Sequence, residues 1–224
     1  MNIEKNVLNQ TDVEEEIRKA ELQRRDVNFE GKIISSLILQ RRKIDKGINL
    51  KNAVVLHVIS FESAVIGGTV DLSGATVKES FFAGSTAIDG DLILIDAKIS
   101  GVVNLISATV RGCVNVERAV ISGFLSLARA QIRDDVILRK AKINDAYHVG
   151  LIVKGDIYMR DALITGGFDA REAFIEGSLD MLNAYVANLV NLQSAQIGEG
   201  LIMKNANFKS GVDLAGTKSK EIIQ

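Results

Sequence analysis

Few residues of this chain have side chains that could do chemistry. The 224 residues include two histidines, His57 and His148, and one cysteine, Cys113. His148 follows Ser126 by 22 residues and precedes Asp169 by 21, so a fold with a period near 22 residues would bring these three side chains together. A histidine that takes the proton of a neighbouring serine is a common way to activate a hydroxyl nucleophile.

We do not expect these residues to form an active site. A nucleophile also needs a pocket that excludes water and donors that stabilise an oxyanion, and nothing in the sequence predicts either. The same repeat position also holds Asn104, Asn191 and Asp213. A solvated row of polar side chains along an exposed face is therefore the better interpretation, and we predict that the chain is not an enzyme.

The remaining candidates predict no metal or cofactor site. His57 has no carboxylate or cysteine at the spacing of zinc ligands. The glycines recur periodically and precede no helix, unlike those of a phosphate-binding loop. Four aspartates do not follow the calcium-binding nonapeptide pattern and are expected to form a solvated charged face; they are Asp89, Asp91, Asp135 and Asp156.

The amino-acid composition bounds the partners and the compartment. With 27 basic and 28 acidic side chains, the formal net charge of −1 creates no field that attracts nucleic acid or an anionic membrane. A single cysteine permits no internal disulfide and fits a reducing compartment. No apolar run resembles a signal peptide or approaches the ~18 residues of a membrane span. We expect a cytoplasmic protein without a membrane span or direct nucleic-acid contact.

The elements that must position these residues come from an eleven-residue repeat. Starting at Ala97, successive units read AKISGVVNLIS, ATVRGCVNVER and AVISGFLSLAR. With the alanine as position 0, the consensus is A-x-I-x-G-x-L-x-L, and the register covers seventeen units from Gly31 to about Thr217. Only the unit from Ala141 to Gly150 has ten residues, which we attribute to a deletion in its turn.

The repeat predicts short strands. Its ordered positions, 0, +2, +6 and +8, alternate with period two, whereas a helix would space its apolar residues three and four apart. Position +4, which is glycine in eight units, predicts a corner where a positive φ is useful, and positions +9 and +10 predict a second corner. Two units would then close a coil of about 22 residues, so seventeen units predict about eight coils.

The repeat resembles that of the pentapeptide-repeat superfamily. Its L-x-x-A-x-I passages, such as Leu105 to Val110, match the spacing of that family's A-[DN]-L-x-x motif, and the eleven-residue unit is closer to a variant found in long bacterial proteins. The resemblance implies a right-handed parallel β-helix with a quadrilateral coil. The chain departs from strict pentapeptides because its central hydrophobes are spaced alternately by six and five residues. Some superfamily members mimic DNA and protect gyrase, a role that the near-zero net charge disfavours here.

The chain divides into three parts. Residues 1–26 form a tail and a helix predicted over 11–25, with Thr11 or Asp12 as the N-cap. Its predicted apolar face, formed by Val13, Ile17, Ala20 and Leu22, would cover the first coil as a plug. Residues 27–217 form the solenoid, and residues 218–224 form a C-terminal tail. The last coil would then present an open strand edge, which favours pairing with another chain.

The outward positions predict two unlike sides of the rod, because alternate units lie on the same side. Even units carry charge, with residues such as Asp45, Arg111, Arg133, Lys154 and Glu176. Odd units predict an apolar association face, formed by Val54, Leu56, Val58, Val102, Val120, Phe124, Leu163, Tyr185 and Leu189.

These features favour a non-enzymatic structural or scaffold protein. We expect it to self-associate, as a dimer or polymer, through the apolar odd-unit face or the open C-terminal end. The alternative is a binding module that modulates a nucleic-acid enzyme in the manner of the pentapeptide-repeat DNA mimics.

Overall fold

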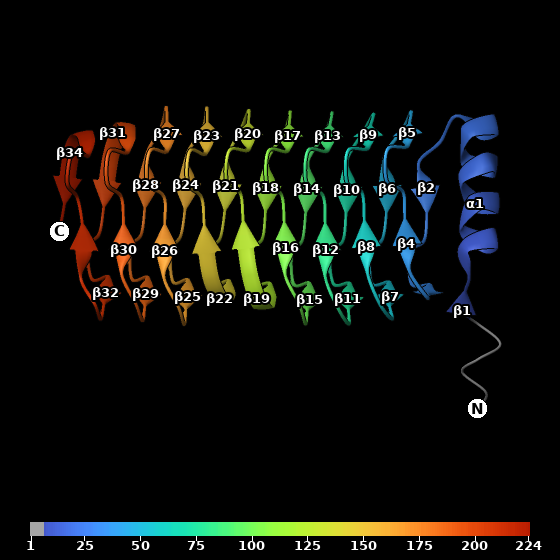
Figure 1. The fold of residues 1–224 in the computed structure, drawn as a ribbon, viewed down its shortest axis with the longest axis horizontal. Coiled ribbons are helices and arrows are strands. Elements are labelled where there is room, and N and C mark those ends of the chain that lie inside the picture. Colours follow the sequence, from blue (N-terminus) through green and yellow to red (C-terminus); the bar gives the residue numbers. More distant parts are fainter. Residues whose placement is uncertain (1–6) are drawn as a thin grey trace.

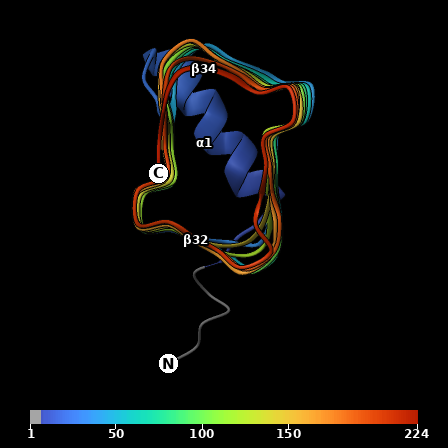
Figure 2. The same ribbon diagram turned by 90° about the vertical axis from the view of Figure 1, so that its left-hand side faces the viewer.

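The computed structural model describes residues 7–224 and shows a β-solenoid with one helix at its N-terminal end (Figure 1). It has about ten turns of about 22 residues each, and the view along the rod shows a four-sided outline (Figure 2). The predicted all-β solenoid is therefore confirmed. It has more than the eight coils expected, because strands before Gly31 and after Thr217 add to both ends.

Odd-numbered units, counted from Gly31, build one parallel sheet of seventeen strands, the odd-unit sheet. Its strands are β1 (Val7–Leu8), β3 (Ile33–Ile34), β4 (Leu37–Ile38), β7 (Val54–Val55), β8 (Ile59–Ser60), β11 (Thr76–Val77), β12 (Phe81–Phe82), β15 (Lys98–Ile99), β16 (Val103–Asn104), β19 (Val120–Ser126), β22 (Lys142–Tyr147), β25 (Leu163–Ile164), β26 (Phe168–Asp169), β29 (Tyr185–Val186), β30 (Val190–Asn191), β32 (Asn207–Phe208) and β33 (Val212–Asp213).

Even-numbered units build a second parallel sheet of seventeen strands, the even-unit sheet. Its strands are β2 (Val27–Asn28), β5 (Lys43–Ile44), β6 (Ile48–Asn49), β9 (Val65–Ile66), β10 (Val70–Asp71), β13 (Ala87–Ile88), β14 (Leu92–Ile93), β17 (Thr109–Val110), β18 (Val114–Asn115), β20 (Gln131–Ile132), β21 (Val136–Ile137), β23 (Ile152–Val153), β24 (Ile157–Tyr158), β27 (Phe174–Ile175), β28 (Leu179–Asp180), β31 (Gln196–Ile202) and β34 (Lys218–Ile223).

Each unit contributes two short strands, and the unit that begins at Ala53 is typical. Ala53, Val55, Ile59 and Phe61 occupy positions 0, +2, +6 and +8, and all four are fully buried. Alternation within a strand turns the intervening residues outward. Position 0 is small because it follows directly on a tight turn, and its alanine leaves room for the larger residues at the other three positions.

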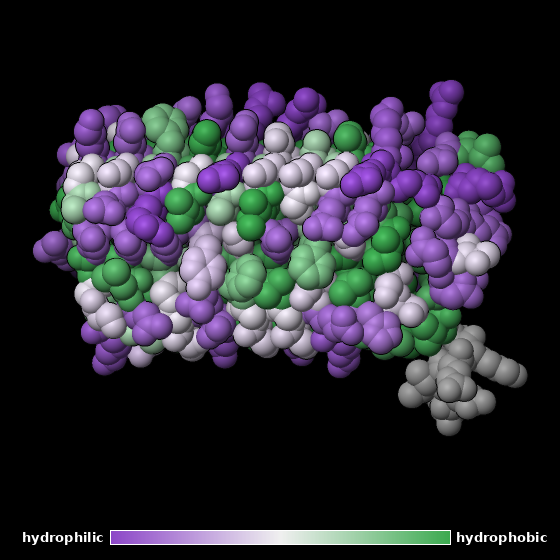
Figure 3. Space-filling view, in the orientation of Figure 1, coloured by the Kyte–Doolittle hydropathy of each residue, from purple (hydrophilic) through white to green (hydrophobic). Residues whose placement is uncertain are grey.

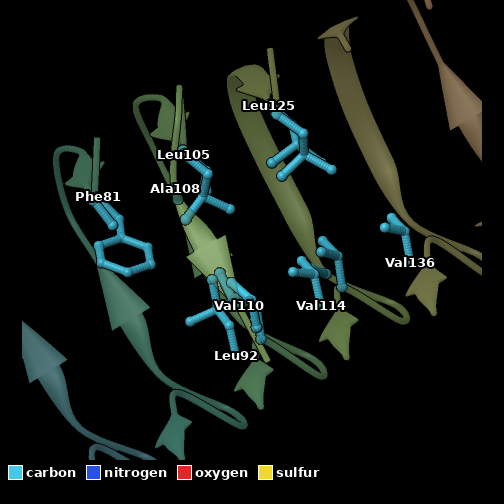
Figure 4. Close-up of a cluster of buried hydrophobic side chains, with 14 of the residues drawn as sticks. Phe81, Leu92, Leu105, Ala108, Val110, Val114, Leu125 and Val136 are labelled. Carbon is cyan, nitrogen blue, oxygen red and sulfur yellow. The ribbon is translucent and has the colours of Figure 1, made fainter. Parts of the chain in front are cut away.

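The core is continuous along the rod. Each strand pairs in parallel with the strand one coil away, so that Val55 lies beside Val77 and Ile59 beside Phe81. Equivalent side chains therefore stack on one another. Figure 4 shows Leu105 and Leu125 of odd units facing Val110 and Val114 of even units across the interior. The helix and all the coils share one hydrophobic cluster.

Position +10, not position +4, takes the left-handed backbone conformation. Asn52, Asp96 and Asn183, all at position +10, have φ of 56°, 57° and 57°. The turn closes with a hydrogen bond from the position 0 amide to the position +8 carbonyl, as from Ala53 N to Leu50 O at 3.0 Å. This is a four-residue turn with a positive φ at its third residue, which Asn, Asp and Gly tolerate best.

The glycines at position +4 serve close packing between coils. Gly101 and Gly123 occupy this position in successive coils of the odd-unit sheet, and neither has a positive φ. The amide of Gly123 donates to the carbonyl of Gly101 at 2.9 Å. A Cβ on Gly123 would lie only 2.6 Å from that same oxygen, so a side chain would force the two corners apart.

The register differs from the predicted one in two units. Gly31 has φ of 64° and is the +10 residue of the preceding unit, so the first unit begins at Lys32, and Ile34 rather than Ile33 points inward. In the unit from Ala141, the missing residue lies at the first corner, not in the turn near Gly150, because Ala146 pairs with Leu125 at position +6.

Both ends of the chain hold more structure than predicted. Helix α1 spans Gln10–Gln23, and its N-cap is Asn9, which forms a capping box with Asp12 instead of the predicted cap at Thr11 or Asp12. Of the predicted tail, residues 1–6 lie outside the described residues, and β1 pairs with β3 before the helix begins. Residues 218–224, assigned to a tail, contain β34, which pairs with β31.

The helix closes the N-terminal end of the solenoid. It lies across the end of the first coil in the view along the rod (Figure 2). Leu22, assigned to the predicted apolar face, is 74% exposed, because two residues at about 100° each place it on the far side of the helix from Ala20. Val13, Ile17 and Ala20 of that face are at most 1% exposed. Their burial covers core residues that would otherwise contact water, which is the role of a capping element in a repeat protein.

Because the coils approach closely at position +4, even a methyl side chain there should lower the free energy of unfolding. Replacing Gly123 by alanine places a Cβ against backbone, so we expect Gly123→Ala to destabilise the fold by about 1–3 kcal/mol. Gly84→Ala is the matched control, because its Cβ would lie at an ordinary 3.6 Å from the nearest atom. Thermal unfolding of the two variants measures the difference, and equal midpoints would contradict the packing role.

Candidate functional surfaces

The predicted odd-unit face is resolved into three columns, where a column is one repeat position in successive coils. Val54, Val120, Leu163 and Tyr185 lie at position +1 and Leu56 at +3, whereas the corner at +5 holds Val58, Val102, Phe124 and Leu189. Of these nine side chains, Val120 and Leu189 are 38% and 41% exposed, and the others are half-buried.

The apolar residues of this face do not form an unbroken strip. Val120 stacks directly between Lys98 and Lys142 of the neighbouring coils. The best-defined apolar contact is the edge of Phe124 against Tyr147, with ring centroids 5.7 Å apart. On the side drawn in Figure 3, hydrophobic and hydrophilic residues likewise intermingle along the rod.

The charged residues of the even units separate into two groups with different roles. Asp91, Asp135 and Asp156 lie at position +5, and their carboxylates accept hydrogen bonds from amides of the next coil. Asp91 accepts from Cys113 N at 2.8 Å, and Asp156 accepts from Ser178 N at 2.6 Å. These aspartates therefore join coils at the corner. The residues at position +3 project outward from the first strand of each even unit and include Asp89 and Arg111.

Cys113 belongs to the same corner column. The thiol is half-buried between the coils of Asp91 and Asp135. Burial raises the pKa of the Cys113 thiol, and the negative charge of these two aspartates raises it further. The side chain therefore stays a protonated thiol at neutral pH, which lowers its reactivity as a nucleophile.

His148 lies in the core, not on the predicted exposed row. The missing corner residue shifts it from position +7 to position +8, so its side chain is fully buried. Its ring packs edge-on against Phe168, with the ring centroids 5.2 Å apart. Tyr147 takes its place in the outward column, between Ser126 and Asp169. The serine and the histidine thus point to opposite sides of the backbone and cannot act as a nucleophile and base.

The imidazole ring of His148 is shielded from solvent. Neither of its ring nitrogens has a hydrogen-bond partner among the described residues. Burial lowers the pKa of His148 to about 4, so the ring is neutral at physiological pH. A neutral polar group enclosed by apolar side chains is a local weakness, because unpaired buried donors and acceptors cost free energy.

His57 has a carboxylate neighbour that was not predicted from the sequence. Its Nδ1 lies 2.9 Å from Oε1 of Glu79, which is 22 residues further along and one coil away. Both side chains are more than half exposed. The structure contains no cluster of three or more metal-ligating side chains within residues 7–224.

The C-terminal coil leaves part of its core exposed. Val190 and Leu192 are fully buried, but the equivalent Val212 and Leu214 of the last coil are partly exposed. In the earlier coil, the amides of Val190 and Leu192 donate to carbonyls of the next coil at 3.1 and 2.9 Å. Within the described chain, β32, β33 and β34 each pair with a strand on one side only. Ile222 of β34 is 46% exposed.

The burial of His148 predicts a specific pH dependence of stability. The pKa of His148 is about 4 in the folded chain, whereas a solvated histidine has a pKa of about 6.5, so only the unfolded state binds the proton between these two pH values. The contribution of neutral His148 to the free energy of unfolding is therefore fully present above pH 6.5. It falls by about 3 kcal/mol as the pH drops towards 4. We expect His148→Leu to remove this loss in urea unfolding measured across that range. His57→Gln, at the exposed histidine, should keep it, and an equal pH slope in wild type and His148→Leu would contradict the assignment.

Comparisons with known proteins do not indicate a function for this chain. No protein-family model matches the chain, and neither the curated proteins nor the solved structures provide a match. The described residues contain no helix that is long and apolar enough to cross a membrane.

Proposed function

We propose that this chain is a non-enzymatic structural protein that associates with a second copy of itself through its last coil. The observation that carries the proposal is the difference between the two ends. Helix α1 buries the apolar residues of the first coil, whereas Val212, Leu214 and Ile222 at the other end contact solvent.

The last coil presents the two kinds of group that a stable junction needs. Its apolar side chains would gain free energy from burial, at roughly 25 cal/mol per Å². Its outward amides and carbonyls are the edge of a sheet, which readily accepts another strand. The last coil of a second copy has the same outline and the same unpaired groups, so it is a congruent partner.

The cap at the first coil determines which ends can meet. A head-to-tail junction would require the last coil to stack on the first, and α1 occupies that position. Two last coils can meet around a twofold axis perpendicular to the rod, with antiparallel strands across the junction. Such an interface uses the same surface on both copies and closes as a dimer.

The odd-unit face is the second candidate for self-association. The contact between Phe124 and Tyr147 supports it, but lysines beside Val120 interrupt the apolar surface. The alternative role, modulation of a nucleic-acid enzyme by mimicry of DNA, would need a continuous acidic stripe. The outward column of the even units instead changes sign between Asp89 and Arg111.

We also infer kinship with the pentapeptide-repeat superfamily and a cytoplasmic location. The A-x-I-x-G-x-L-x-L unit and the coils of about 22 residues support the kinship. The single, half-buried cysteine supports a reducing compartment.

Sedimentation in about 0.5 M salt, where exposed charges are screened, tests the junction. We expect a dimer at micromolar concentration that Leu214→Glu and Ile222→Glu each weaken at least tenfold, because each places a charge in the buried junction. Ile106→Glu is the matched control, since Ile106 is also exposed, at 40%, but lies in a turn in the middle of the rod.

Other outcomes would contradict this version. A strictly monomeric wild type would overturn self-association altogether. If Phe124→Glu with Leu189→Glu dissociates the dimer and the end variants do not, the odd-unit face is the interface and the end-to-end junction is wrong.

A further inference from the structure

The outward column of the even-unit sheet has an ordered pattern of charge. At position +3, six consecutive coils present Asp45, Gly67, Asp89, Arg111, Arg133 and Lys154, and the strands beneath them pair in register. We call these six residues the charge column. Neighbouring members lie one coil apart, about 4.8 Å. The first half of the column is acidic and the second half is basic.

Within one molecule, most of these charges already have a neighbour of opposite sign. Arg111 contacts Asp89 at 2.8 Å, Asp45 contacts Lys43 at 2.8 Å, and Lys154 lies 4.0 Å from Glu176. Arg133 is exposed, and no ion pair among the described residues includes it. The column therefore carries an excess of positive charge around Arg133.

The three cations border a shallow hollow of about 190 Å³. Thr109, Gln131 and Ile152, at position +1, form its other side, and buried Val110 and Ile132 form its floor. The hollow therefore combines cationic side chains with a polar hydroxyl and amide, which suits carboxylates.

We propose that the hollow receives Asp45 and Asp89 of a second copy, docked antiparallel, with the two even-unit faces together. The twofold axis would run between the coils of Asp89 and Arg111. Asp89 then lies opposite Arg111 of the second copy, and Asp45 lies opposite its Lys154. Symmetry repeats each contact, so one interface contains four pairings of opposite charge.

This arrangement places carboxylates of the second copy beside Arg133. Arg133 lies opposite Gly67 of the second copy, between the carboxylates of that copy's Asp45 and Asp89. Gly67 has no side chain to occupy the space that the guanidinium needs. The neighbouring column at position +1 also fits, because small Ala87 lies opposite Thr109.

The charges also specify the register. A shift by one coil in one direction places Arg111 opposite Arg111 of the second copy. A shift in the other direction places Asp89 opposite Asp89 of the second copy. A parallel arrangement places every residue of the column opposite itself. Like charges in contact disfavour all three alternatives, whereas the proposed register uses all six members of the charge column without a like-charged pair.

The contact is expected to be modest and sensitive to salt. Five steps of about 4.8 Å give a length of about 24 Å, and exposed ion pairs contribute little individually. It uses a different surface from the C-terminal junction and does not depend on it. Together, the two contacts would join end-to-end dimers side by side into larger assemblies.

A charge exchange tests the proposal in dilute salt, with Ile222→Glu in every chain to weaken the C-terminal junction. Asp45→Lys with Asp89→Lys makes the column entirely basic apart from Gly67, and Arg111→Glu with Lys154→Glu makes it mainly acidic. We expect each double variant alone to self-associate at least tenfold more weakly than the Ile222→Glu chain by sedimentation. An equimolar mixture should recover association, because all four opposite-charge pairings are restored between unlike chains.

The matched control changes the same number of charges elsewhere. Lys98→Glu with Lys142→Glu removes two lysines that are likewise two coils apart, on the odd-unit sheet, and should associate like the Ile222→Glu chain. Circular dichroism checks that every variant is folded. The proposal is overturned if the exchanged variants associate as the background does, if their mixture shows no recovery, or if the control weakens association equally. The end junction is judged separately, from the effect of Ile222→Glu alone in high salt.

Discussion

Each coil of this protein depends on the coil stacked beside it. A single eleven-residue unit has three large inward side chains, and their burial contributes less free energy than the ordering of eleven residues costs. Only stacking in register adds the backbone hydrogen bonds and the second layer of packing that make up the difference. The parallel pairing of Val55 with Val77, repeated along the rod, is this interaction in its simplest form.

This dependence makes the two ends and the corners the places where the chain departs from its repeat. Helix α1 replaces a neighbouring coil at the first end and buries Val13, Ile17 and Ala20. The last coil has no equivalent within the described chain, and Val212 and Leu214 remain partly exposed. Corners bring backbones together, so they select glycine at Gly123 and aspartate at Asp91, which binds an amide of the next coil.

The fold could be predicted from sequence because the repeat shows both the alternation of inward and outward residues in each strand and the length of a coil. The period of eleven, the alanine at position 0 and the β-branched residue at +2 determine which side chains are buried in nearly every unit. The predicted face residues Val120 and Leu189 do lie on the surface, although their role as an interface is still a prediction. Of the residues predicted for the capping face of α1, Val13, Ile17 and Ala20 are buried but Leu22 is exposed. The predicted N-cap was also wrong, because Asn9 and Thr11 are both good capping residues.

The errors come from single-residue gaps, which periodicity cannot locate. In the unit from Ala141, a gap at the corner and a gap in the turn both restore the following register, but they give His148 opposite orientations. The pairing of Ala146 with Leu125 resolves this and buries the imidazole. Similarly, Asp89 and Asp91 look equivalent in sequence, yet one projects outward to Arg111 and the other binds the amide of Cys113. The charge column emerges only once the coils are stacked.

Hydrogen exchange of the last coil, followed as a function of protein concentration, tests the central claim most directly. The amides of Val212 and Leu214 correspond to those of Val190 and Leu192, which donate to a following coil. If a second copy completes the last coil, these two amides exchange rapidly in dilute solution and become protected as concentration rises, while those of Val190 and Leu192 stay protected throughout. Exchange at Val212 and Leu214 that is independent of concentration would contradict the account.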